Sequence, residues 1–214
     1  MDNFNRVEKA YFESPNIEEY ANKYIQYISE ILDCLDRKAI AQFIEVIIDA
    51  RTRGANIYFI GNGGSAATAS HFANDLSAGT RSWDRPFKAV SLADNNAVLT
   101  AIGNDCGFDE VFLQQLRVHL KQNDVVVAIS ASGNSPNILK AIEYANVSNA
   151  ITVGLTGFDG GILRKIVKYS LHVPSNKGEY GPVEDVHMII DHLLYGYLLG
   201  LIKNEKSMEL KNEF

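Results

Sequence analysis

Five short apolar runs alternate with stretches of helical periodicity from residue 55 onward, and this alternation constrains the fold more than any other feature. The runs lack the strict apolar–polar alternation of half-exposed strands, so they predict strands that are buried on both faces. Buried strands joined by helices form a parallel sheet with helices on both sides. The predicted strands are ANIYFIG (55–61), FKAVSL (87–92), DVVVAIS (124–130), AITVGLTG (150–157) and YSLHVP (169–174).

Helical periodicity fills the gaps between these runs and also precedes the first of them. The predicted helices of the core span 65–78, 95–102, 109–120, 134–145 and 182–203. Upstream, apolar residues recur at helical spacing over 17–53, and a break near Asp36 predicts an N-terminal helical hairpin. The sequence thus predicts one α/β domain over 1–214. It comprises the hairpin, a three-layer, doubly wound, five-stranded parallel core over 55–203, and a tail over 204–214.

Composition narrows the class of protein. A formal net charge of −6 argues against a broad nucleic-acid surface, although it leaves room for a local anion site. Cys34 and Cys106 form no CxxC pair, which fits a reducing compartment. The N-terminus lacks a signal-type apolar core, and LLYGYLLGLI (193–202) is too short to span a bilayer. We therefore expect a cytoplasmic protein with neither a nucleic-acid partner nor a membrane partner.

The segment AISASGNSPNIL (128–139) carries three serines between a predicted strand and a predicted helix. Hydroxyl groups and free backbone N–H groups at such a junction suit a phosphate. The same letters also fit a plain turn before a capped helix with Pro136 in its first turn. The GxSxG pattern of a serine nucleophile is absent. The segment predicts an anion site or a structural turn, and no nucleophile.

A second glycine- and serine-rich turn, GNGGS (61–65), follows the first predicted strand. It is neither GxGxxG nor a P-loop, so a nucleotide site is not expected. In the helix after it, His71 and Asp75 are four residues apart and share one face. They could be two metal ligands, a base with its orienting partner, or a surface hydrogen-bonded pair.

Two further segments carry polar residues for which the sequence allows more than one role. Asn104 and Asp105 end an apolar helix, where they could cap the next helix or face a ligand. Glu184 falls in the acidic first turn of the last helix. His192, farther along that helix, lies among apolar residues, so it is either a packed core residue or a catalytic one.

Taken in order, five segments resemble the sugar isomerase (SIS) domain and, within it, the phosphoheptose isomerase branch. They are GNGGSAATASHFANDL, RPFKAVSLADNNAVLTAIGNDCGFDEVF, AISASGNSPNILKAI, VGLTGFDGG and VEDVHMIIDHLL, and the resemblance covers about 17–203. It implies a homotetramer of flavodoxin-like subunits with active sites at subunit interfaces and a Zn²⁺ ion in each subunit. It also implies conversion of sedoheptulose 7-phosphate to D-glycero-D-manno-heptose 7-phosphate through an enediol, for surface polysaccharide.

The matching motifs carry the family's functional positions onto this chain. The substrate-binding positions fall on Asn62, Gly63, Gly64, Ser65, Asp75, Asn104, Asp105, Ser130, Ala131, Ser132, Ser135 and Glu184. The metal positions fall on His71, Asp75, Glu184 and His192. Asp75 and His192 are expected to share the proton transfers of an aldose–ketose isomerisation, because a carboxylate and an imidazole can serve carbon and oxygen in turn.

Two positions depart from the family's pattern, because the isomerases usually have Glu at position 75 and Gln at position 184. On a regular helix, moreover, Glu184 and His192 are separated by about 12 Å along the axis. Both could reach one ion only from a non-helical lead-in or with long extension of the side chains.

Two other functions suit the same resemblance. One is a non-catalytic SIS scaffold like the relatives that associate with a replication initiator. The other is a sugar-phosphate-sensing regulatory domain. The presence of His71, an acid at position 75 and His192 favours the enzyme.

Overall fold

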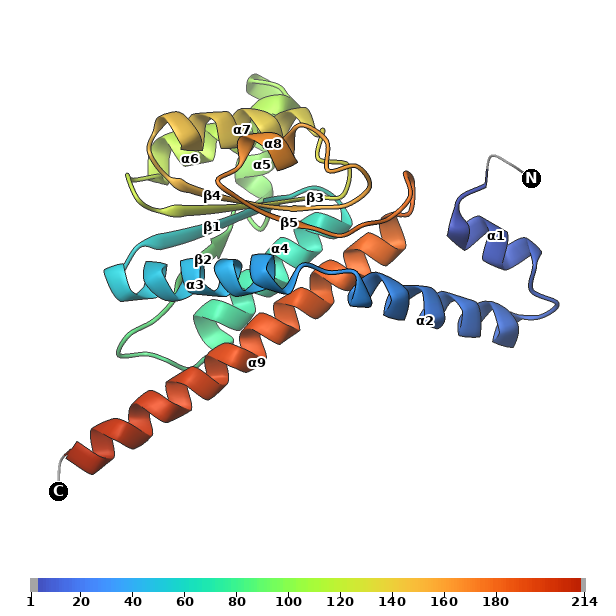
Figure 1. The fold of residues 1–214 in the computed structure, drawn as a ribbon. Coiled ribbons are helices and arrows are strands. Elements are labelled where there is room, and N and C mark those ends of the chain that lie inside the picture. Colours follow the sequence, from blue (N-terminus) through green and yellow to red (C-terminus); the bar gives the residue numbers. More distant parts are fainter. Residues whose placement is uncertain (1–3, 213–214) are drawn as a thin grey trace.

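The core of the protein is a sheet of five parallel strands in the order β2-β1-β3-β4-β5 (Figure 1). The structure, a computed structural model, describes residues 4–212. The strands are β1 (Asn56–Gly61), β2 (Lys88–Ser91), β3 (Val125–Ser130), β4 (Ile151–Thr156) and β5 (Tyr169–His172). This is the flavodoxin-like order, which places a ligand crevice at the carboxyl ends of β1 and β3. The predicted fold class is confirmed.

Helices cover both faces of the sheet (Figure 1). One face packs against α3 (Arg37–Arg53), α4 (Gly64–Asn74) and α9 (Tyr180–Asn212). The other packs against α5 (Asn96–Asp105), α6 (Leu113–His119), α7 (Pro136–Val147) and α8 (Leu163–Ile166). Alternate residues of β1 serve the two layers, since Phe59 belongs to the first cluster and Ile60 to the second. Both are fully buried, as the uninterrupted apolar runs predict.

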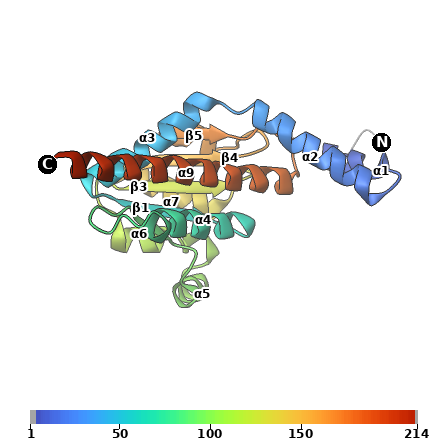
Figure 2. The same cartoon turned by 90° about the horizontal axis from the view of Figure 1, so that it is seen from below.

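The N-terminal region contains the two predicted helices but not the predicted hairpin. α2 (Ile17–Asp33) and α3 are separated at Asp36, whose carboxylate caps α3. The two helices follow one another nearly end to end in both views (Figures 1 and 2). The short connector explains this, because Leu35 is buried in the core while the Arg37 guanidinium donates to the carbonyls of Asp33 and Leu35. α2 instead packs against α9 and against α1 (Arg6–Phe12), which sequence patterning missed.

The last helix, α9, is longer than the pattern predicts and includes most of the expected tail. By length and composition alone, Tyr180–Met208 could cross a membrane. Its apolar stripe is nevertheless buried in the core, as in the central helix of a globular domain; the stripe comprises Val183, Val186, Ile190, Leu194, Leu198 and Ile202. Beyond residue 203, Glu205 of this helix has a partner on α3.

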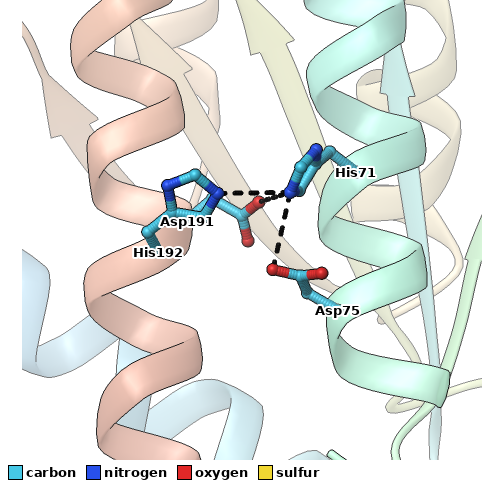
Figure 3. Close-up of side chains that lie close together, drawn as sticks. All are labelled: His71, Asp75, Asp191 and His192. Carbon is cyan, nitrogen blue, oxygen red and sulfur yellow. Dashed lines mark hydrogen bonds and ion pairs between the residues drawn. The ribbon is translucent and has the colours of Figure 1, made fainter. Parts of the chain in front are cut away.

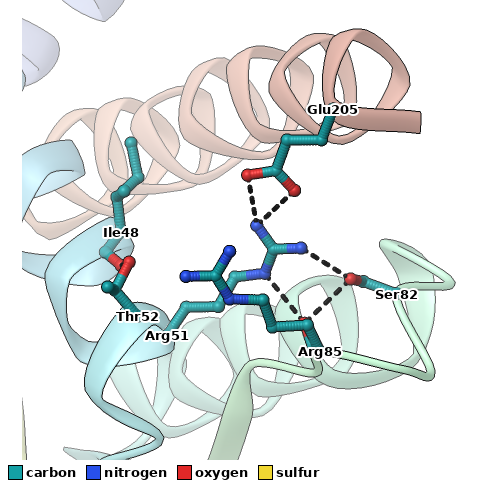
Figure 4. Close-up of polar contacts among 6 residues, drawn as sticks. All are labelled: Ile48, Arg51, Thr52, Ser82, Arg85 and Glu205. Carbon is teal, nitrogen blue, oxygen red and sulfur yellow. Dashed lines mark hydrogen bonds and ion pairs between the residues drawn. The ribbon is translucent and has the colours of Figure 1, made fainter. Parts of the chain in front are cut away.

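That partner is Arg51, a buried guanidinium that joins three segments (Figure 4). Its Nη1 donates to both carboxylate oxygens of Glu205, at 3.0 and 2.9 Å. Its Nε donates to the carbonyl oxygen of Arg85 at 2.8 Å, and its Nη2 donates to the Ser82 hydroxyl at 2.9 Å. The planar group also lies over the ring of Phe87, 5.1 Å from the centroid. Arg51 thereby fixes the end of α9 and the loop that leads into β2.

We expect Arg51→Lys to lower the free energy of unfolding by about 2–3 kcal/mol, because an ammonium cannot supply donors in the guanidinium's fixed geometry. Glu205→Gln should cost less, about 1 kcal/mol, because about a third of the Glu205 side chain is exposed. Urea unfolding followed by circular dichroism measures both. Equal effects of the two substitutions would contradict this ranking.

Candidate active site

The three serines of the 128–139 segment line a small cavity at the carboxyl end of β3. The cavity has a volume of about 120 Å³, and its lining comprises Asn62, Ser65, Ile129, Ser130, Ala131, Ser132, Ser135, Tyr180 and Glu184. Ser135 is the N-cap residue of α7, and its hydroxyl makes no capping bond within the helix. That hydroxyl and the positive end of the helix dipole therefore point to an anion. The structure brings Ser130, Ala131, Ser132 and Ser135 together as the sequence predicts.

The loop after β4 supports the serine loop from behind. Gly157 donates its N–H to the carbonyl of Ala131, and Leu163 donates to that of Gly133, both at 2.9 Å. Gly133 has a φ of 62°, and a Cβ there would collide with the carbonyl oxygen of Gly160. A side chain at Gly133 would therefore force the two loops apart.

The glycine-rich turn after β1 is fastened to the same place by a pair of amides. Asn62 and Asn137 exchange two hydrogen bonds, each 2.9 Å long, between their side chains. Asn137 lies in the first turn of α7 and is buried. The pair thus fixes the turn after β1 against the helix after β3, with Ser65 and Asn62 facing the serine cavity.

Glu184 lies in this cavity rather than with the histidines. It projects from the start of α9 against Gly64, where a Cβ would overlap its carboxylate. Burial, with Asp185 beside it, raises the pKa of Glu184 above its ordinary value. The predicted role of Glu184 as a metal ligand is not supported, because α9 is already regular at this residue and carries it away from His192.

Four other side chains form a compact cluster between α4 and α9 (Figure 3). The Nε2 atom of His71 lies 3.2 Å from the Nε2 of His192 and 3.6 Å from Oδ2 of Asp75. It also lies 3.9 Å from Oδ2 of Asp191. One donor atom from each of the four residues falls within 4.8 Å of the others. His71, Asp75 and His192 meet as predicted.

Asp191 is the member of this cluster that sequence reasoning missed. It is fully buried, and neither of its carboxylate oxygens has a hydrogen-bond partner among the described residues. Burial, together with the nearby carboxylate of Asp75, raises its pKa to about 8. An acid in the buried stripe of α9 was the available signal. His187, one turn earlier, is also buried, which lowers its pKa to about 4 and makes it a neutral packing residue.

Local backbone geometry aims Asp75 at the cluster. α4 ends at Asn74, and a π-helical turn (Asp75–Gly79) begins at Asp75, closed by the Thr80 N–H on the Asp75 carbonyl at 3.0 Å. Such π turns occur frequently at functional sites. The second oxygen of Asp75, Oδ1, accepts from the Asn74 amide at 3.1 Å, which leaves Oδ2 directed toward His71.

The cavity and the cluster lie along the same pair of helices. Gly64 on α4 touches Glu184 on α9, and farther along His71 meets Asp191 and His192. The two helices therefore run in the same direction. On α9 the cavity and the cluster are separated by two turns, or about 10 Å.

Two of the predicted substrate-binding residues lie away from both the serine cavity and the His–Asp cluster. Asn104 and Asp105 are exposed at the end of α5, which stands out from the body of the molecule (Figure 2). Neither lines the serine cavity. Gly63 and Gly64 shape the turn beside the cavity without lining it.

Comparisons with known proteins identify relatives of this chain. The SIS domain model matches residues 19–157. The phosphoheptose isomerase of Rhodospirillum rubrum is 39% identical over 158 residues, which cover 74% of this chain and 83% of that protein. The phosphoheptose isomerase of Solidesulfovibrio magneticus is 39% identical over 178 residues, or 83% of each chain.

Solved structures show the same relationship. Phosphoheptose isomerase GmhA of Neisseria gonorrhoeae matches with a TM-score of 0.75 and 29% identity, over 86% of this chain and 98% of that one. A phosphoheptose isomerase from Francisella tularensis matches with a TM-score of 0.76 and 29% identity, over 85% and 95%. The chain therefore belongs to the SIS-domain family and, within it, to the phosphoheptose isomerases.

Proposed function

We propose that this protein is an aldose–ketose isomerase that converts sedoheptulose 7-phosphate to D-glycero-D-manno-heptose 7-phosphate for surface polysaccharide synthesis. The observation that carries the proposal is the pairing of an anion cavity with a His–Asp cluster two helical turns away. A seven-carbon sugar phosphate has the length to place its phosphate in the first and its C1 and C2 in the second. Relatives named phosphoheptose isomerase at 39% identity support the same substrate.

The phosphate end is bound by neutral donors. The hydroxyls of Ser130, Ser132 and Ser135 line the cavity, and the α7 N-terminus adds its dipole. No lysine or arginine lines this cavity among the described residues. Recognition of this kind depends on loop geometry, which the amide pair and the loop after β4 supply.

The reacting end is served by Asp75 and His192. Isomerisation removes a proton from C1 of the ketose, moves a proton between the oxygens of the enediol and returns a proton to C2. The Asp75 carboxylate takes the carbon-bound proton, and the His192 imidazole serves O1 and O2. Both lie within 4.8 Å of His71 Nε2, so one substrate carbon pair can contact both.

The donor set also fits the Zn²⁺ ion that the resemblance implies. Two imidazoles and an acid from adjacent helices, with donor atoms within 4.8 Å, are ligands that zinc prefers. His71, Asp75 and His192 would hold it. When bound, the ion would act as a Lewis acid toward the enediolate oxygens.

We further propose a homotetramer with active sites at the interfaces between subunits, in the cytoplasm. Large apolar side chains exposed on α1 and α2 support an assembly; they are Tyr11, Phe12, Ile17 and Ile25, with Ile17 86% exposed. Asn104 and Asp105 on the outstanding α5 would then be placed to reach a neighbouring subunit's substrate.

Incubation with sedoheptulose 7-phosphate in deuterated water tests the reaction, run with and without a chelator. We expect deuterium at C2 of the aldoheptose, because the base exchanges its proton with solvent before returning it. Asp75→Asn and His192→Gln should each lower kcat by at least about 100-fold, while the Kd for inorganic phosphate stays unchanged. Near wild-type kcat in both would refute the acid–base assignment. Absence of exchange with any heptose or hexose phosphate would favour a non-catalytic scaffold.

Glu184→Gln tests the position of the carboxylate in the phosphate cavity. Removing a negative charge beside a bound dianion should lower the Kd for inorganic phosphate by roughly 5- to 10-fold, measured by calorimetry. Asp185→Asn is the matched control, because Asp185 faces away and accepts from the Tyr24 hydroxyl at 2.6 Å. Equal Kd values for Glu184→Gln and the wild type would show that the carboxylate does not oppose the phosphate.

A further inference from the structure

Asp191 is a buried carboxylate whose hydrogen-bonding capacity is unused. The residue has no exposed surface, and both oxygens lack partners among the described residues. Removing a carboxylate from water without replacing its hydrogen bonds is costly, so native proteins rarely retain such a group without a role. Nothing in the proton-transfer scheme above uses it.

The atom that Asp191 approaches shows whether it suits the role of a metal ligand or that of a residue that only orients a metal-bound histidine. Carboxylates that only orient a metal-bound histidine bond the ring nitrogen that faces away from the ion. Asp191 instead approaches Nε2 of His71, the same atom that Asp75 and His192 approach, at 3.9, 3.6 and 3.2 Å respectively (Figure 3). The donors converge on one point.

The spacing of the two imidazoles fits a shared ion. Two nitrogens bound to one tetrahedral zinc at 2.0–2.1 Å are separated by ~3.3 Å. The Nε2 atoms of His71 and His192 are 3.2 Å apart. The ring centroids are 5.1 Å apart with an interplanar angle of 68°, so the contact is made through these nitrogens and not by stacking.

Glu184 has no place in this arrangement. It lies seven residues before Asp191, about 10 Å along α9. Its carboxylate lies against Gly64 and lines the serine cavity.

We propose that Asp191, rather than Glu184, completes a metal site with His71, Asp75 and His192, and that the site takes a divalent ion such as Zn²⁺. The inference rests on the proposed function only for the expectation of a metal. Two imidazoles and two carboxylates suit borderline divalent ions. With Asp191 in the set, four protein donor atoms lie within 4.8 Å of one another, one more than the three that catalytic zinc sites use.

Metal binding to the purified full-length protein tests this directly. Apoprotein prepared by dialysis against a chelator is titrated with Zn²⁺ in competition with a chromophoric chelator, and with Co²⁺ followed by its visible absorption. Asp191→Asn should weaken Zn²⁺ binding more than about 100-fold, beyond the 10- to 100-fold typical of outer-shell partners, and should abolish the four-coordinate Co²⁺ spectrum. Glu184→Gln and the matched control Asp185→Asn should each change the affinity less than about 10-fold.

A second substitution guards against loss of folding. Asp191→Leu fills the same buried position with an apolar group, so this variant should remain folded and raise the unsupplemented Tm while losing metal. Zn²⁺ should raise the Tm of the wild type and of Glu184→Gln, but of neither variant at position 191. The inference is overturned if position-191 variants bind Zn²⁺ within about 10-fold of the wild type, if Glu184→Gln loses as much as they do, or if the wild type binds no ion.

The isomerase assay separates this inference from the proposed function. A wild type that binds Zn²⁺ through Asp191 but turns over no sugar phosphate would reject the isomerase and leave the metal site standing. An active wild type whose position-191 variants still bind Zn²⁺ would support the isomerase and reject Asp191 as a metal ligand.

Discussion

The packing of α4 against α9 in the same direction is the constraint on which the rest of the site depends. Both helices begin at the carboxyl edge of the sheet, where Gly64 lets them approach until Glu184 touches the backbone. Farther along, the hydroxyl of Tyr195 donates to the carbonyl of Gly79 at 3.1 Å. Residues at similar distances from the starts of the two helices therefore meet, and that distance decides whether they lie at the serine cavity or at the His–Asp cluster. The start of each helix faces the serine cavity, and about two turns farther along both helices the histidines meet.

Sequence patterning predicted what local periodicity and parallel topology determine. The strands, the break at Asp36 and the meeting of two loops beyond β1 and β3 all follow from buried apolar runs and the flavodoxin-like order. The relation of α2 to α3 did not follow, because both a hairpin and an end-to-end arrangement bury one apolar stripe on each helix. The burial of Leu35 and the bonds of Arg37 decide between them, and neither leaves a periodic signal.

The site, like the fold, could be predicted from the sequence only in part. His71 and Asp75 share a helix face by spacing alone, and His192 came from motif resemblance. Asp191 was not predicted because adjacent residues of a helix point in different directions. The identification of His192 therefore did not indicate that Asp191 would reach the same cluster. An acid in the stripe formed by Val183, Ile190 and Leu194 is a local conflict, and such conflicts mark functional positions. Glu184 illustrates the opposite error, since the motif was matched correctly and the structure places the residue elsewhere.

The balance of charge relates the two unusual acids of this site, Asp75 and Asp191. Two ionised carboxylates close to one another would repel a developing enediolate. Burial and the nearby Asp75 raise the pKa of Asp191 to about 8, so Asp191 keeps its proton near neutral pH unless a cation is bound. A divalent cation held between Asp75 and Asp191 would let both acids ionise, would offset both charges and would leave the site able to accept a negative intermediate. In the metal site proposed above, the ion rather than side-chain length would bring the four residues to one point, and this would accommodate the shorter Asp75 side chain.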